Sequence, residues 1–145
     1  MAFTRPDPKM GTQGDVLGLR IAAFLIDAIL FAVVSGVVFG AAFVAVESPA
    51  LLALVWLLGG LAFFAYFIYF EGTSGQTVGK RVTSIVVVRE DGRPLGYGGA
   101  TIRTLLRIVD ALPTLYLIGL LLILVTDDNQ RLGDLAADSV VVRTT

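Results

Sequence analysis

The chain has 145 residues, of which 56% are hydrophobic and 16% are charged, and its mean hydropathy is +0.83. Soluble domains carry about 25% charged residues, so this composition excludes an ordinary soluble domain and indicates an integral membrane protein. The net charge of −1 gives no basis for nucleic-acid binding. Without cysteine or histidine, disulfides, thiolate nucleophiles and most zinc or haem sites are excluded, so we expect no enzyme, no cofactor and no metal site.

Residues 1–18 form a polar segment ahead of the first apolar stretch. They include Pro6, Pro8, Gly11 and Gly14, residues that favour irregular backbone. Terminal segments of this kind are poorly ordered unless something ties them down. The sequence therefore predicts a flexible N-terminal tail, followed by a single membrane domain over the rest of the chain.

A first membrane helix is predicted over residues 19–46, where Arg20 and Asp27 are the only charged residues. The stretch is long enough to cross a bilayer and too long for the apolar core of a signal peptide. A carboxylate within it costs about 2.5–3.5 kcal/mol on insertion scales, so Asp27 must face protein or water. Two interpretations stay open: a buried partner for Arg103 or Arg107, or a carboxylate that titrates or binds an ion.

Small residues recur every four positions along the same helix, at Ala28, Ala32, Gly36 and Gly40. Such a face lets two membrane helices approach closely. We expect it to pack against the second helix of this chain, with another subunit as the alternative. Because three or four short helices can hardly enclose a pathway alone, we also expect a homo-oligomer.

A second membrane helix is predicted over residues 50–70, after the short turn 47–49, so that the two helices form an antiparallel hairpin. Its end is rich in aromatic residues, of which Tyr66 and Tyr69 fit an interfacial belt. Lysine and arginine occur in the N-terminal segment and in residues 71–107 but not in the turn. The positive-inside rule then places both charged segments in the cytoplasm. The expected location is a prokaryotic plasma membrane, with the lipid bilayer as partner.

Two β-branched segments are the strand candidates, residues 82–89 and residues 139–143. The first is followed by Asp91-Gly92, a strong tight-turn signal. A lone strand is not stable, so we expect the two to pair in a small cytoplasmic β element. The loop Gly75–Lys80 is interpreted as a basic interfacial loop near anionic headgroups.

A third apolar region covers residues 101–126, but three charges share one helical face in its first half: Arg103, Arg107 and Asp110. One interpretation is a simple interfacial pair between Arg107 and Asp110. The other is a polar cavity lined by these residues together with Asp27, which makes the four charged residues a candidate ion or proton site.

The topology of this third region depends on Pro113, which breaks it. A single crossing would put the C-terminus outside and separate the two strands. We therefore favour a helical hairpin in which residues 101–112 enter amphipathically and residues 115–125 return, with a single crossing as the alternative. The expected fold is therefore an all-α polytopic membrane protein with a small β element. Two further segments complete the predicted membrane domain: a cytoplasmic loop with a strand, residues 71–100, and a C-terminal segment, residues 127–145.

Three charged residues stand in an order that is specific when taken together: Arg20 at the start of the first helix, Asp27 inside it and Asp134 near the C-terminus. With the segment Gly75–Arg81 and the two strands, they resemble the RDD family of membrane proteins, named for one arginine and two aspartates. The resemblance runs from about residue 14 to residue 143. We expect Arg20 to pair with Asp134, because arginine suits bidentate carboxylate bonds.

The resemblance implies a membrane domain and, for some relatives, transport that includes cation/proton exchange. Our first hypothesis is transport of an ion or small solute, with Asp27 as the coupling carboxylate and Arg20, Arg107 and Asp110 as tuning charges. The second is a membrane anchor or scaffold subunit that does not transport and that binds an unidentified membrane or cytoplasmic partner protein.

Overall fold

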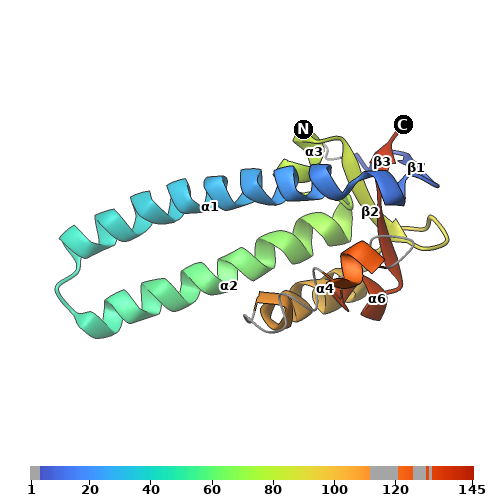
Figure 1. Cartoon of the computed structure of the whole chain (residues 1–145). Helices are drawn as coiled ribbons and strands as arrows, with labels where there is room; N and C mark the ends of the chain where they lie inside the picture. The colour runs from blue at the N-terminus through green and yellow to red at the C-terminus, as the bar shows by residue number, and fades with distance from the viewer. Residues whose placement is uncertain (1–3, 112–120, 126–129, 131) are drawn as a thin grey trace.

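The computed structural model describes residues 4–111, 121–125, 130 and 132–145. Two long antiparallel helices project from a smaller assembly of short helices and strands (Figure 1). The elements in chain order are β1 (Pro8–Lys9), η1 (Gln13–Asp15), α1 (Leu17–Ala45), α2 (Pro49–Thr73), α3 (Val78–Val82), β2 (Ile85–Arg89), α4 (Gly96–Ala111), α6 (Leu132–Ala136) and β3 (Ser139–Thr144). Residues 121–125 are also helical.

The hairpin of α1 and α2 is long and apolar enough to cross a membrane. At 1.5 Å per residue, helices of 29 and 25 residues exceed the roughly 30 Å of a hydrocarbon core. Only 11% and 6% of their most apolar stretches are buried within the chain, unlike the core helices of a soluble protein. The two predicted helices are thus confirmed, with ends that differ by at most three residues.

The turn at the far end of the hairpin, which we call the tip, is set by local chemistry. Ser48 caps α2 by accepting a hydrogen bond from Leu51 N at 3.4 Å, and Pro49 occupies the first helical turn. Behind the tip, the rings of Phe39 and Trp56 stack with centroids 4.6 Å apart. Aromatic packing therefore joins the two helices in this half of the hairpin.

The two glycines of the small-residue face of α1 do not make the expected close contact with α2. A Cβ atom added at Gly36 or Gly40 would meet nothing within 4 Å. The close approach lies at Gly59 of α2 instead, where a Cβ atom would sit 2.9 Å from Phe39 Cζ. One large ring facing one glycine thus replaces the small-on-small packing that the sequence pattern predicted.

A three-stranded antiparallel sheet, in the order β1-β3-β2, lies at the other end of the hairpin, which we call the base (Figure 1). Its two longer strands are those that the sequence predicted to pair, in a register that places Val87 opposite Val141. Both faces of the sheet are buried. One face, with Val87 and Val141, packs on Val16 and Ala23 at the start of α1.

The N-terminal segment is not the free tail that the sequence predicted. Pro8 and Lys9 form β1 on the open edge of β3, and Thr12 Oγ1 accepts a hydrogen bond from Arg143 N at 2.9 Å. Val16 is fully buried. The segment is ordered because it pairs with a strand edge that would otherwise be exposed.

The third apolar region begins as α4, which starts five residues earlier than predicted. α4 packs against the base end of α2 and against α6. The predicted break at Pro113 lies outside the described residues, as does most of the predicted returning helix, of which residues 121–125 are described and helical.

Candidate functional site

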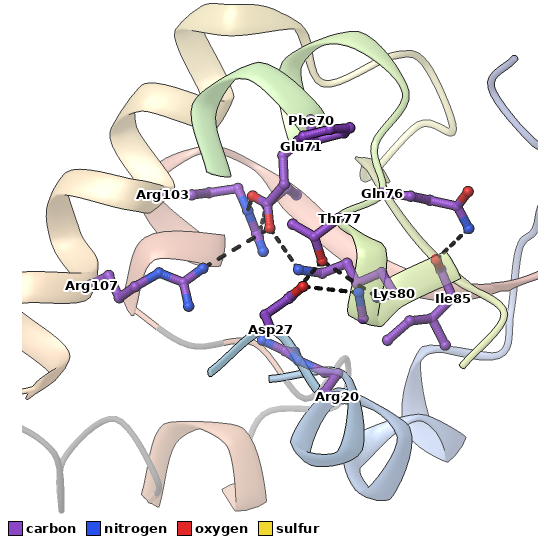
Figure 2. A network of polar contacts seen from close by, with 12 residues as sticks. Arg20, Asp27, Phe70, Glu71, Gln76, Thr77, Lys80, Ile85, Arg103 and Arg107 are labelled. Carbon is purple, nitrogen blue, oxygen red and sulfur yellow. Dashed lines mark hydrogen bonds and ion pairs between the residues drawn. The ribbon is translucent and has the colours of Figure 1, made fainter. Parts of the chain in front are cut away.

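A polar network fills the base of the hairpin, where α1, α2, α3, α4 and α6 meet (Figure 2). The arginine and the two aspartates on which the family resemblance rests all take part in it: Arg20, Asp27 and Asp134. The network has two parts. One is the hydrogen-bonded site around Asp27, and the other is an ionic cluster around Glu71 and Asp134, which we call the charge cluster.

Asp27 is buried and its carboxylate is fully engaged. Oδ1 accepts hydrogen bonds from the Tyr66 hydroxyl at 2.7 Å and from Gly79 N at 2.9 Å. Oδ2 accepts one from the Thr77 hydroxyl at 2.6 Å. Tyr66 Oη in turn accepts from Val78 N at 3.0 Å. One carboxylate therefore joins α1, α2 and the start of α3, and these donors offset its burial.

The close approach of α3 to α1 requires glycine at position 79. A Cβ atom there would lie 2.0 Å from Ala23 O and 3.0 Å from Asp27 Cγ. Thr77 prepares the same turn as the N-cap of α3, since its Oγ1 accepts a hydrogen bond from Lys80 N at 3.3 Å. The segment Gly75–Lys80, interpreted above as an interfacial loop, is therefore largely buried structure against α1.

Glu71 is the acid at the centre of the charge cluster, and the sequence analysis missed it. Its Oε1 contacts Lys80 Nζ at 2.6 Å, and its Oε2 accepts a hydrogen bond from Arg103 Nε at 3.1 Å. Arg107 NH2 lies 4.0 Å from Oε1. The predicted helix ended at residue 70 and left Glu71 in a loop. One further turn would have placed it four residues after Phe67, on the same buried face.

Asp134 is the second acid of the charge cluster. Its Oδ2 lies 2.7 Å from Arg20 NH2, so the pair expected from the sequence is present. Arg103 NH1 also pairs with Asp134 and donates a hydrogen bond to Ser139 Oγ at 2.8 Å. Because Arg103 also contacts Glu71, this one guanidinium links α2, α6 and the start of β3.

Of the two interpretations left open for Asp27, the one that makes it a partner of Arg103 or Arg107 is wrong. The described contacts of Asp27 involve neither arginine, since Arg103 pairs with Glu71 and Asp134. The Arg107 guanidinium stacks over the ring of Phe67 at 4.0 Å from the centroid. Asp110 lies in α4, but its side chain is outside the described part of the structure.

Lys80 is a buried cation held beside its counter-ion. Burial lowers the pKa of Lys80 to about 8, while the neighbouring Glu71 carboxylate opposes this shift by favouring the charged form. In the charge cluster, the cations Arg20, Lys80, Arg103 and Arg107 surround the two carboxylates of Glu71 and Asp134. The carboxylate of Asp27 is held by neutral donors instead.

The sequence model of the RDD family matches residues 16–138, a range that contains both parts of the network. Two proteins named "Proline-rich antigen homolog", from Mycobacterium tuberculosis strains CDC 1551 / Oshkosh and ATCC 25618 / H37Rv, are each 34% identical over 103 residues. That alignment covers 67% of this chain but 42% of each relative, so the chain spans less than half their length. No solved structure matches.

Proposed function

The chain belongs to the RDD family, and from that premise we propose that it is a multi-pass membrane protein that serves as an anchoring module. In this proposal, α1 and α2 cross the plasma membrane, and the charge cluster and the Asp27 site lock the sheet against the base of the hairpin. Two features support the crossing: the apolar surface of both helices is largely uncovered by the chain, and the tip lacks lysine and arginine whereas the base is rich in them.

One observation carries the anchoring role: the three buried acids in the described part of the chain have their partners within the chain. Asp27 accepts three hydrogen bonds, and Glu71 and Asp134 each contact at least two cations. Carboxylates held in this way favour a fixed joint between helices. The longer relatives agree with a modular role, because the matched region makes up 42% of each.

Transport of an ion or small solute, including cation/proton exchange, is the second candidate function. The position of Asp27 favours it, because the side chain is buried within a candidate membrane span and intramembrane carboxylates commonly serve ion or proton pathways. The half-buried Tyr66 hydroxyl, 2.7 Å away, is the group through which a proton would reach it.

Proton flux in proteoliposomes, with a trapped pH dye and an imposed sodium, potassium or lithium gradient, separates the two functions. The anchor proposal expects no cation-dependent flux from folded wild type, and lower stability for both Asp27→Asn and Glu71→Gln. Transport expects a cation-dependent flux in wild type that Asp27→Asn abolishes without loss of fold. Asp91→Asn, at an exposed turn, is the matched control and should leave flux and stability unchanged.

A further inference from the structure

The helix α4 is amphipathic, but its charged side faces the protein and its apolar side faces outward, the reverse of a surface helix in a soluble protein. Its charged side, with Arg103 and Arg107, faces the rest of the chain. Its outer side carries Ile102, Leu105 and Ile108, with exposed fractions of 42%, 54% and 51%. Water would normally select the reverse arrangement, so the outer face of α4 needs an apolar environment.

The charged side of α4 cannot simply turn outward, because its groups are fixed in the charge cluster. Arg103 is almost fully buried and binds Glu71, Asp134 and Ser139. Arg107 stacks on an aromatic ring of α2. Rotation of the helix would break these pairs and remove one cation from each of the buried carboxylates of Glu71 and Asp134, so the apolar face stays outward.

The direction of α4 relative to α2 follows from two contacts. Near its start, the Tyr97 side chain lies against Gly72, where a Cβ atom would be 2.6 Å from the ring. Ten residues later, Arg107 lies over Phe67. The ten residues advance about 15 Å along α4, while Gly72 to Phe67 advances about 7.5 Å along α2. α4 therefore runs obliquely from the base toward the tip.

Other described helices of the chain also expose apolar side chains. α4 packs on α2, whose outward Leu61 is 57% exposed. The helical residues 121–125 expose Leu121 and Leu124 in the same way. Because β2 and β3 pair in one sheet, the chain that leaves through α4 returns to the base.

We propose that α4 is embedded obliquely in one leaflet of the bilayer beside α2, with Ile102, Leu105 and Ile108 in contact with lipid acyl chains. This inference rests on the proposed crossing of the hairpin. The charge cluster keeps the arginines of α4 away from lipid, because Glu71 and Asp134 neutralise them on the protein side. The described side chains Ile102, Leu105 and Ile108 then meet lipid. In this placement α4 enters the membrane from the base side, the side on which β2 and β3 pair.

Site-directed fluorescence tests the placement, since the chain has no native cysteine. Single cysteines at Leu105, at Val37 in α1 and at Asp91 in the turn after β2 would be labelled with bimane and reconstituted in phosphatidylcholine vesicles. Quenching by doxyl-labelled lipid and by aqueous iodide would be compared. We expect Leu105 to behave like Val37, quenched by lipid and protected from iodide, and Asp91 to behave in the opposite way. Ile108 supplies a second position on the same face.

Each other result overturns the inference in a distinguishable way. Iodide quenching at Leu105 with lipid quenching at Val37 would place α4 outside the membrane and leave the hairpin proposal intact. Protection of Leu105 from both quenchers would mean that a second copy of the chain or another protein covers the face. Loss of lipid quenching at Val37 would reject the membrane hairpin itself, and the placement of α4 with it.

Discussion

The tip and the base of the hairpin are held together by different interactions. Near the tip, α1 and α2 meet through aromatic packing, with Phe39 stacked on Trp56 and facing Gly59. At the base, the same two helices are joined by Asp27 and Tyr66, and α2 is tied to α3 and α4 through Glu71.

The contrast gives a structural reason for the charged residues at the base. Near the tip, apolar contacts are enough to hold α1 against α2, because only two helices meet there. At the base, five elements must keep one arrangement, and hydrogen bonds and ion pairs between named atoms are directional where apolar contacts are not. We therefore expect substitutions at the base to cost far more stability than substitutions toward the tip.

The largest effect is expected for Arg103→Met. The change removes one partner from Glu71 and Asp134 while both acids stay buried, and breaking a buried ion pair costs about 3–5 kcal/mol. Thermal unfolding in detergent micelles, followed by circular dichroism, measures the loss. Arg93→Met is the matched control, since Arg93 is exposed and pairs with Asp91 on the surface, and it should change little. Equal melting temperatures for the two variants would contradict the role of the charge cluster.

Gly79→Ala should come next in size. The new methyl group would meet Ala23 O, a backbone atom that cannot move without shifting α1. We expect the contacts of Asp27 with α3 to be lost and stability to fall by about 1–3 kcal/mol, the usual cost of overpacking. Gly98→Ala in α4, where a Cβ atom meets open space, should be neutral or slightly stabilising. If both glycine variants melt like wild type, α3 does not pack on α1 as described.

Much of the fold could be predicted from the sequence, because each long helix and each of the two longer strands has a recognisable pattern within its own residues. Long apolar runs predict α1 and α2, and two β-branched segments predict the pairing of β2 with β3. β1 was missed because Pro8-Lys9 has no strand signal of its own. Its order comes from the free edge of β3, where Pro8 pairs with Thr144 and Lys9 with Arg143. Partners so far apart in the chain leave no local pattern in the sequence.

The network at the base was predicted less well for a related reason. Helical periodicity tells which charges share a face, and it correctly placed Arg103 and Arg107 together, but it does not identify their partners on other elements. The partners of Asp27 include a hydroxyl and a backbone N–H in the turn at Thr77–Gly79, groups that carry no charge signal. Glu71 was missed because the end of α2 was placed three residues too early.

The two ends of α1 can be compared directly through Asp27→Asn near the base and Ser35→Ala farther toward the tip. The amide keeps the shape of the side chain, but its NH2 group replaces one of the two oxygens that accept hydrogen bonds from Tyr66, Thr77 and Gly79. We expect a loss of about 1–3 kcal/mol, the cost of an unsatisfied buried polar group. Ser35→Ala, two turns farther along α1 and without a described partner network, is the control. A stable Asp27→Asn protein would remove the structural reason for a carboxylate here and favour transport.

The pH dependence of stability should depend on Lys80. Its folded pKa of about 8 lies below the usual 10.5, so between these values the unfolded chain binds more protons, and this group makes stability rise as pH increases. In Lys80→Met that contribution should vanish. The measurement is the difference in melting temperature between wild type and Lys80→Met from pH 7.5 to 10. A difference that does not change with pH would show that Lys80 titrates normally and is not held in a buried site.

The smallest effect is expected toward the tip, at Gly36→Ala. A Cβ atom at this position meets open space within the chain, and alanine is a better helix former than glycine by about 1 kcal/mol, so the isolated protomer should be unchanged or slightly more stable. The four-residue spacing of Gly36 and Gly40 would matter only if another helix packs closely there. Cross-linking in vesicles separates the cases: a homo-oligomer that uses this face should weaken in Gly36→Ala, and more so in Gly36→Leu. An oligomer that survives both changes must use a different surface, and the small residues of α1 would then simply face lipid.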